Sequence, residues 1–385
     1  MAWLSGWDHR MKWTADSSDT AKVTATITKP SIPVFFGSSV GKDSDDNTAI
    51  FDEIGSNWDE MAITYGDTEE LYVEVEDWDS VNSGGVVWIG DNTDSSWTVV
   101  SGTDRTGWIY YKDGNTNAGR VGAIGSTDVG ERVWDSSHEM VQHMVDENAT
   151  GDTVLDSTSN DIDGAKTSAD NPEKAAGLIG GLPADTAQDF NGSDGIGLGD
   201  DIWTDSVGTI EAWIEMDAVG VINPIFSAAD DVVVDDMLRF TVYYDGTVNN
   251  RLAMQLYRGP GSNFFTYIND VTVDTGRHHV CVSSNGSKWK LYYDGVPGNL
   301  TDDYIDVDAG EWFDDLSGSN VTFRIGHQKT SAAEVYADGV IDEMRVSSSQ
   351  RTDAWIKANY YFQTDDLLYF GSEERLFHPY IIFFS

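Results

Sequence analysis

The chain has 385 residues, of which 40% are hydrophobic and 12% aromatic, which is enough for about two to three packed domains. Its 66 Asp and Glu outnumber its 23 Lys and Arg, and the formal net charge is −43. Such a surface repels the phosphates of nucleic acids, so DNA and RNA binding are excluded. The acids are spread along the whole chain, which favours adaptation to salt water over a surface that needs divalent ions.

The chain contains one cysteine, Cys281, in an alternating strand pattern, so no internal disulfide is possible and we expect a buried thiol. The first residues lack the basic start and apolar run of a signal peptide. No stretch reaches the apolar length of a membrane span. We therefore expect a surface-type protein that leaves the cell by another route, and assembly into a virus particle is one such route.

Residues 1–135 are predicted to form a β-sandwich, because short apolar runs alternate with turn residues at regular spacing. From Trp7 onward the chain also contains, in order, the pieces IPVFF, ELYVEVEDWD, VVWI, WIYYKDGN, RVWD and LDSTSNDIDG. Over residues 5–165 this ordered set resembles a domain of unknown function that commonly precedes laminin-G-like domains in microbial surface and viral proteins. The resemblance implies no chemistry for this half.

Residues 136–175 are predicted to be an irregular connector, because Asp, Ser, Asn and Gly dominate its second part. Asp156, Asp161 and Asp163 cluster there. The spacing of a calcium-binding EF-hand loop, with its late Glu, is absent. We therefore interpret the three carboxylates as turn and capping residues, with a calcium loop as the alternative.

Residues 176–370 are predicted to form a second sandwich, which gives an all-β chain with two jelly-roll-like domains in tandem. In TIEAWIEM, residues Ile210, Ala212 and Ile214 share one face of a strand, and Asp-Gly pairs at 245–246 and 294–295 mark hairpin turns. Six pieces occur in order: AQDFNGSDGIGLG, GTIEAWIEM, GRHHVCVSSNGSKWKLYYDGV, FRIGH, GVIDEMRV and RTDAWIKANY. Together they resemble the laminin-G/concanavalin A-like jelly-roll family, with one departure at Arg277, where the family usually has Trp.

That resemblance implies one structural Ca²⁺, held by an early loop and by the Asp of the late strand. The matching positions are Asn191 and Gly192, partly through backbone oxygens, and Asp342. Hard oxygen ligands suit Ca²⁺, and the ion would offset the burial of Asp342. The alternative is that Asp342 pairs with Arg345 or with backbone amides.

Sugar recognition uses exposed aromatic rings beside carboxylates and amides. The most promising segment is RGPGSNFFTY (258–267), because Gly-Pro-Gly cannot continue a strand and exposes the residues after it. Trp203 and Phe313 are further loop candidates. The aromatic residues predicted to bind the ligand are Tyr257, Phe264, Phe265, Tyr267 and Trp312.

No catalytic residue is predicted. A glycosidase of this fold needs two carboxyl groups that face one cleft, and the nearest string, Glu74-Val75-Glu76, lies in the other half of the chain. Asp342 and Glu343 are adjacent, so on a regular strand they point to opposite faces. The same argument separates His278 from His279 and excludes a metal pair there.

We therefore expect a non-enzymatic structural protein of a tailed virus, as a tail fibre, a tail tip or a capsid decoration, whose lectin-like domain binds a host-surface glycan. We also expect a homo-oligomer. The alternative is a cell-surface adhesin or polysaccharide-binding module of a salt-adapted microbe. The apolar tail, residues 371–385, is either a last strand of its own domain or an anchor that docks into other virion proteins.

Overall fold

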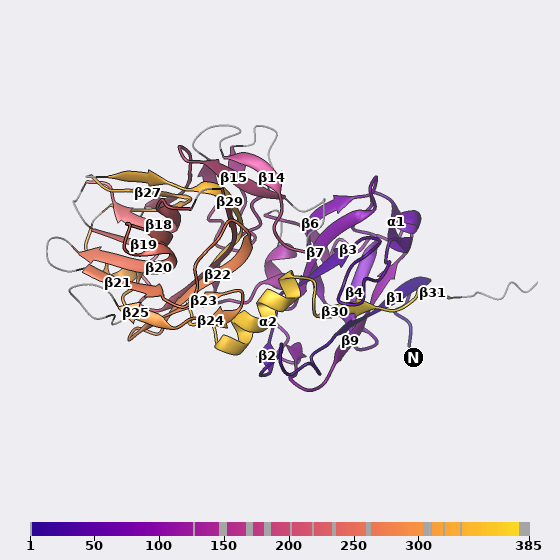
Figure 1. Cartoon of the computed structure of the whole chain (residues 1–385). Coiled ribbons are helices and arrows are strands. Elements are labelled where there is room, and N and C mark those ends of the chain that lie inside the picture. The colour runs from indigo at the N-terminus through magenta and orange to yellow at the C-terminus, as the bar shows by residue number, and fades with distance from the viewer. Residues whose placement is uncertain are drawn as a thin grey trace, which may run out of the picture. The chain divides into compact units, whose positions relative to one another are not determined.

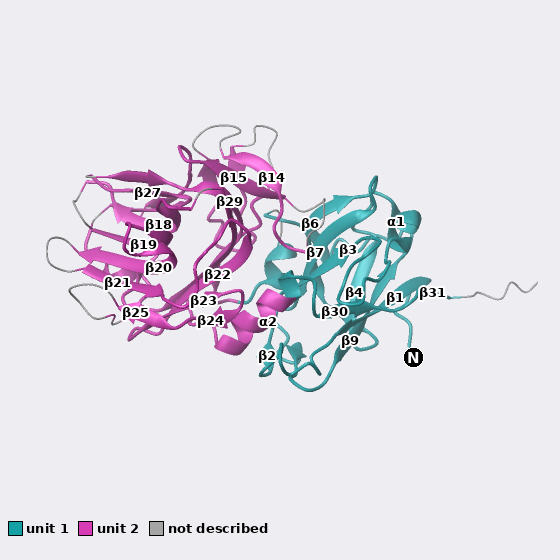
Figure 2. Cartoon of the chain, viewed as in Figure 1, with its two compact units in different colours: residues 1–135, 362–385 teal, residues 136–361 magenta. Residues whose placement is uncertain are grey.

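The chain folds into two compact units, residues 1–135 with 362–385, and residues 136–361 (Figure 2). Almost all regular structure is β-strand (Figure 1), so the all-β prediction is confirmed. Within the described residues, no helix has both the length and the apolar character required to cross a membrane. The computed structural model describes residues 2–125, 128–145, 152–166, 172–180, 186–200, 202–217, 219–232, 236–258, 263–302, 308, 310–318, 320–331 and 333–376.

The first unit is a β-sandwich made of two sheets. One sheet contributes the buried side chains Trp13, Ile63 and Ile109, and the other contributes Val34 and Val87. A short helix, α1 (Ala49–Ile54), and a strand pair, β2 (Ile27–Thr28) with β8 (Thr98–Val99), complete it. One sheet has the order β30 (Leu368–Phe370), β1 (His9–Ala15), β9 (Arg105–Tyr111), β4 (Met61–Tyr65) and β5 (Glu69–Glu70), and β31 (Glu374–Arg375) also pairs with β1. The other has the order β10 (Val121–Ala123), β6 (Tyr72–Asp79), β7 (Gly84–Gly90) and β3 (Ile32–Phe36).

The end of the chain returns to this first unit, which corrects the predicted limit of the second domain at residue 370. The strands β30 and β31 both pair with β1, where Trp13 lies opposite Phe370 and Arg10 opposite Glu374. The edge of β1 offers unpaired backbone groups that an extended segment satisfies. An ion pair between Arg10 and Glu374, 2.7 Å from nitrogen to oxygen, fixes the second strand. The apolar residues 377–385 of the predicted tail lie outside the described residues.

A buried carboxyl group lies in the turn that leads into β30. Asp365 has a φ of +60° and accepts a hydrogen bond from the backbone N–H of Gly41. Burial raises the pKa of Asp365 to about 7, and the charges of Asp366 and Asp45 add to the shift. In the folded protein this carboxyl therefore holds its proton into the neutral range.

This raised pKa predicts that the protein loses stability as the solution becomes neutral. The folded state binds the proton more tightly than the unfolded chain, so the stability is present below the ordinary carboxyl pKa and is lost as the pH rises through about 7. Asp365→Asn keeps an acceptor for Gly41 without the charge, and should gain on the order of 2 kcal/mol over the wild type at pH 8. Melting curves from pH 5 to pH 8 test this; parallel pH profiles for the two proteins would contradict it.

The second unit is also a sandwich, made of two sheets that we name after their central strands. The β29 sheet has the order β14 (Glu173–Ala176), β15 (Thr186–Asn191), β29 (Asp338–Ser347), β17 (Gly208–Met216), β22 (Arg277–Ser284), β23 (Trp289–Tyr293) and β24 (Val296–Pro297), with β11 (His138–Gln142) also beside β29. The β19 sheet has the order β12 (Thr153–Val154), β13 (Gly164–Lys166), β16 (Ile196–Asp200), β26 (Val321–Ile325), β18 (Asn223–Asp230), β19 (Asp236–Tyr244), β20 (Asn249–Arg258), β21 (Asn263–Ile268) and β25 (Leu300–Asp302). Ile210, Ala212 and Ile214 lie in the core between them, on one face as predicted.

The predicted connector, residues 136–175, is part of this sandwich, because it supplies the strands β11 to β14 to both sheets. The carboxylate of Asp156 holds the segment between β11 and β13 in place. It accepts backbone N–H groups from Val141 (2.8 Å), Thr158 (3.0 Å) and Ile162 (3.0 Å). This is the turn-forming role predicted for it, while burial raises its pKa to about 7.

The strand β29 contains a bulge, which corrects the prediction that Asp342 and Glu343 point to opposite faces. Ile341 and Met344 both lie in the core, so two residues separate consecutive core positions. Glu343 has a φ of +50°, and the register between β17 and β29 shifts at this point. Both carboxylates therefore leave the core on the same side of the sheet.

Each of the two carboxylates has its own compensation. Asp342 accepts the backbone N–H groups of Leu178 (2.7 Å) and Glu343 (2.8 Å), which is the backbone-amide alternative stated above. Glu343 accepts a hydrogen bond from Arg345 and lies 2.6 Å from Nδ1 of His143. Burial alone would raise the pKa of Glu343, but the charges of His143 and Arg345 hold it below the ordinary value.

The buried guanidinium group of Arg345 also serves a second carboxylate, Glu211 on β17, at 3.6 Å. Replacement by Met would remove the guanidinium from both carboxylates and leave only His143 beside Glu343 and His279 beside Glu211. We expect a loss of about 3–5 kcal/mol in the free energy of unfolding. The matched control is Lys290→Met, which breaks an exposed pair with Asp353 and should cost less than about 1 kcal/mol. Urea unfolding measures both. Equal losses for the two variants would contradict this account.

The helix α2 (Asp353–Gln363) covers the outer face of the β29 sheet at β22 and β23 (Figure 1). Ile356 packs against Cys281 and Tyr292, so the thiol is buried as predicted, and burial raises its pKa. Tyr360 stacks on Trp213 with ring centroids 5.7 Å apart. The outer face of the β19 sheet carries no helix within the described residues.

Candidate ligand-binding face of the second unit

A row of four polar side chains and one aromatic ring crosses the outer face of the β19 sheet. Residues directly opposite one another on neighbouring strands share a face, and the register places five of them in line. Their chain neighbours, such as Leu238 and Phe240, point into the core. We call this set the outer row; from β26 to β21 it consists of Arg324, Ser227, Arg239, Gln255 and Phe265.

Hydrogen bonds fix the side chains of this row. Arg239 donates from Nε to Oε1 of Gln255 and from Nη1 to Oε1 of Gln328, both at 2.9 Å. Gln255 donates in turn to Oδ1 of Asn263 at 3.3 Å. These four side chains are each less than 10% exposed, so they form a held network of amide and guanidinium groups.

Aromatic rings border the row at its β21 end. Tyr243 lies 4.6 Å from Phe265 and Phe265 lies 5.7 Å from Tyr267, measured between ring centroids. These rings form a small cluster with Val248 that is separate from the main core. Tyr257 and Tyr267 are half-buried, so part of each ring faces solvent.

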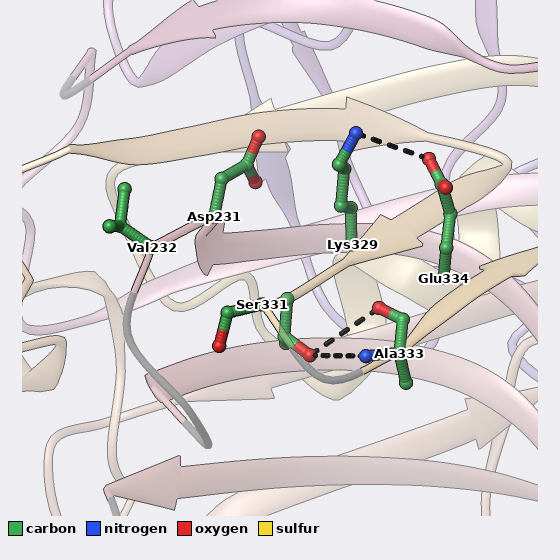
Figure 3. Close-up of a pocket in the computed structure, with 7 residues that line it drawn as sticks. Asp231, Val232, Lys329, Ser331, Ala333 and Glu334 are labelled. Carbon is green, nitrogen blue, oxygen red and sulfur yellow. Dashed lines mark hydrogen bonds and ion pairs between the residues drawn. The ribbon is translucent and has the colours of Figure 1, made fainter.

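A hairpin made of β27 (His327–Lys329) and β28 (Glu334–Tyr336) borders the other end. Ser227 donates to the backbone oxygen of His327 at 2.7 Å, and Nη2 of Arg324 donates to both carboxylate oxygens of Asp231, at 2.7 and 2.6 Å. A pocket of about 540 Å³ lies beside this hairpin, and Figure 3 draws the residues that line it. It is lined by Asp231, Val232, Lys329, Thr330, Ser331, Ala333 and Glu334. Through Asp231 it adjoins the Arg324 end of the outer row.

The second unit matches a known superfamily over most of its length. Residues 190–357 match the family model of the concanavalin A-like lectin/glucanases superfamily. The predicted resemblance of the second half to this family is therefore confirmed. We refer to residues 136–361 below as the concanavalin A-like domain.

Solved structures show likeness at low identity, and no curated protein matches the sequence. A carbohydrate-binding module, CBM40 of the Ruminococcus gnavus IT-sialidase bound to α2,3-sialyllactose, is 14% identical; the match covers 49% of this chain and 98% of that one, with a TM-score of 0.37. Domain 4 of AbnA, an arabinanase from Geobacillus stearothermophilus in complex with arabinotriose, is 19% identical over 58% and 100%, with a TM-score of 0.43. No ligand of this chain can be assigned from likenesses of this size.

The concanavalin A-like domain places the predicted ligand-binding aromatics in three different environments. Tyr257 and Tyr267 lie half-buried on the outer face. Phe265 is on that face but only 1% exposed, and Phe264 packs against the main core. Trp312 is fully buried in that core beside Phe313, with Trp203 stacked on Phe313 in turn. Residues 259–262 of the predicted loop lie outside the described residues.

Arg239 and Gln255 are the members of this face that the sequence analysis missed. The signal was present in LRFTVYY (238–244), because a strand with Leu238 and Phe240 in the core must turn Arg239 and Thr241 outward. The prediction of the binding face relied on aromatic loop residues and did not consider this strand. A charged side chain at an outward position in the middle of a sheet is the more specific sign of a binding face.

The predicted calcium ligands do not come together. Asn191 lies opposite Asp338 on β29, and Asp342 lies four residues further along that strand, roughly 13 Å away at about 3.3 Å per residue. Both oxygens of Asp342 already accept backbone N–H groups. The N–H of Gly192 donates to the backbone oxygen of Ala337. These three residues therefore do not fit one shared ion.

The carboxylates considered for catalysis are buried away from this face. Glu74 and Glu76 lie in the first unit, where each accepts an indole N–H at 2.6 Å, from Trp134 and Trp88 respectively. The outer row itself contains no carboxylate. Asp231, which lines the cavity beside the row, has both of its carboxylate oxygens hydrogen-bonded by Arg324.

Proposed function

We propose that the concanavalin A-like domain is a non-catalytic glycan-binding domain whose ligand lies across the outer face of the β19 sheet. The observation that carries this proposal is the outer row, in which buried amide and guanidinium groups are fixed next to half-buried tyrosine rings. Sugar sites combine these two elements, because hydroxyl groups exchange hydrogen bonds with fixed polar groups and the apolar ring faces stack on aromatics. The match of residues 190–357 to a superfamily that includes lectins supports it.

The absence of a carboxylate pair from the outer row supports binding without hydrolysis. Glycosidases flank the scissile bond with two carboxyl groups, about 5 to 9.5 Å apart according to the stereochemistry. Asp231 is held by Arg324, and an acid locked in an ion pair is a poor proton donor. The outer row therefore offers contacts for a sugar chain and no groups to cleave it.

We further propose that the whole chain is a homo-oligomeric structural protein of a tailed virus, such as a tail fibre, tail tip or capsid decoration, that presents this domain to a host-surface glycan. The tandem sandwiches and the strongly acidic surface support a role outside the cell in salt water. An adhesin or polysaccharide-binding module of a salt-adapted microbe is the alternative. Mass spectrometry of purified particles decides between them, since a virion protein must be present in stoichiometric amount.

Glycan binding by the full chain tests the first proposal. We expect binding to at least one class of immobilised oligosaccharide, and Tyr257→Ala and Tyr267→Ala should each weaken it about tenfold, or about 1.4 kcal/mol, through lost ring stacking. The matched control is Tyr369→Ala, which removes a half-buried ring from β30 in the first unit. Wild-type affinity in both test variants, or no binding to any oligosaccharide, would overturn the proposal.

We also propose that the calcium expected from the family resemblance binds near Asn191 and without Asp342. Asp194 is 1% exposed, and its Oδ1 accepts the N–H of Asn191, while Oδ2 has no hydrogen-bond partner among the described residues. Burial raises the pKa of the neighbouring Asp189, and the charges of Asp217, Glu173, Asp194 and Asp338 raise it further. A hard cation would give Oδ2 of Asp194 a partner and would offset the repulsion among these carboxylates.

Thermal unfolding after chelation tests the calcium proposal. Added Ca²⁺ should raise the melting temperature by about 5 °C at one hundred times its Kd, while Mg²⁺, which prefers a stricter geometry, should not. Asp194→Asn should abolish the shift, whereas Asp342→Asn should lower the melting temperature and keep the shift. A shift that disappears only with Asp342→Asn would restore the original ligand set.

A further inference from the structure

Arg239 is a buried cation to which the described residues bring no negative charge. It is 6% exposed, and its two side-chain hydrogen bonds both go to neutral amides, Gln255 and Gln328. Within the described residues no carboxylate lies within ion-pair distance of it. Two other buried arginines of the same domain behave differently, since Arg324 pairs with Asp231 and Arg345 with Glu343.

Burying the charge of Arg239 without a carboxylate beside it costs free energy. Burial lowers the pKa of Arg239, and the ionisable groups that act against this effect are the phenols of Tyr243 and Tyr257, which are neutral near pH 7. The guanidinium carbon lies 5.4 Å from the centre of the Tyr243 ring, and a cation–π contact of this kind contributes only about 0.5–2 kcal/mol. The chain has 66 acids, so a lack of carboxylates does not explain the missing partner.

The guanidinium is oriented for an incoming group. Of its five N–H donors, one on Nε and one on Nη1 are used by the two amides, which leaves three. Gln255 holds it from the neighbouring strand and Gln328 from the hairpin, so its plane is fixed before any ligand arrives. A fixed planar fork fits a carboxylate through two parallel hydrogen bonds.

A second arginine on the same face repeats the pattern. Arg251 lies opposite Tyr243 on β20 and donates from Nη1 to the backbone oxygen of Val271. It also has no carboxylate partner within the described residues. The outer face thus carries two arginines near Tyr243, with Arg239 four residues before it on β19 and Arg251 opposite it on β20.

We propose that Arg239 binds the carboxylate of an acidic sugar, so that the domain recognises uronate-type or other carboxylate-bearing glycans in preference to neutral ones. This inference rests on the glycan-binding function proposed above and names its ligand class. The ligand supplies the negative charge that the described residues do not bring to Arg239. Tyr257 and Tyr267 contact the sugar rings, and Arg251 binds a second acidic sugar unit of the oligosaccharide.

The test compares each acidic oligosaccharide with its methyl ester, which has the same ring and hydroxyl groups but no charge. The panel contains oligogalacturonate, glucuronate-containing, alginate and sialylated oligomers, and neutral oligomers with and without sulfate esters. Using the full chain and calorimetry, we expect at least one acid form to bind at least tenfold tighter than its ester. Because this comparison uses the wild-type protein, it does not depend on any variant folding.

Variants then assign the preference to Arg239. Arg239→Met should bind acid and ester forms equally, and Arg239→Lys should keep a reduced preference, since it retains the charge without the fork. The Arg239→Met variant should unfold at the same denaturant concentration as the wild type. If the guanidinium had a structural role, its loss would clearly lower the unfolding midpoint. Lys290→Met, an exposed cation on the other sheet, is the matched control and should leave the preference unchanged.

The outcomes separate the two proposals. Equal affinity for acid and ester in the wild type overturns this inference and leaves the glycan-binding function standing. Preference for sulfated neutral oligomers over carboxylated ones overturns the carboxylate assignment. Binding to no member of the panel overturns both proposals together.

Discussion

The bulge in β29 sets the arrangement of the second unit. By placing Asp342 and Glu343 on one side of the strand, it puts two buried carboxylates on the outer face of a central strand. Glu211 on the adjacent strand brings a third. Arg345, His143 and backbone amides compensate these charges. Buried ion pairs are stable only when water is kept out and every partner is in place. At Glu211 the helix α2 provides this cover, because Asn359 donates to the carboxylate.

Because α2 covers one outer face, the proposed binding face is the other one. The two outer faces of a sandwich are its largest flat surfaces, and here α2 packs on the β29 sheet through Ile356, Tyr360 and Asn359, whose amide donates to Glu211. The outer face of the β19 sheet is bordered by the hairpin of β27 and β28 and carries no helix within the described residues. The two faces also differ in their buried arginines. Arg345 forms an ion pair with Glu343, whereas among the described residues Arg239 is hydrogen-bonded by the neutral amides of Gln255 and Gln328.

Much of this could be predicted from the sequence, because alternation is a strong signal where one face of a strand is buried. It correctly indicated the core positions Ile210, Ala212 and Ile214, and the burial of Cys281. It failed at Glu343, because a non-glycine residue at positive φ leaves no mark in the sequence and shifts every later side chain by one face. The return of residues 368–375 to β1 was also invisible, because strand pairing across more than 350 residues has no local signature.

The burial of Arg239 can be explained by the net charge of the chain, which is −43. At long range the protein repels any anionic glycan, so an exposed cation would gain little from steering and would be paired by the acids around it. A recessed guanidinium avoids such pairing and acts only at contact distance. In salt water the screening length falls to a few ångströms, roughly 3 Å at 1 M. The repulsion between protein and glycan then fades, while hydrogen bonds made inside a partly desolvated site persist. An acidic surface is therefore compatible with a buried arginine to which the described residues bring no carboxylate. In the proposed binding domain, this combination favours a ligand whose carboxylate reaches the outer row itself.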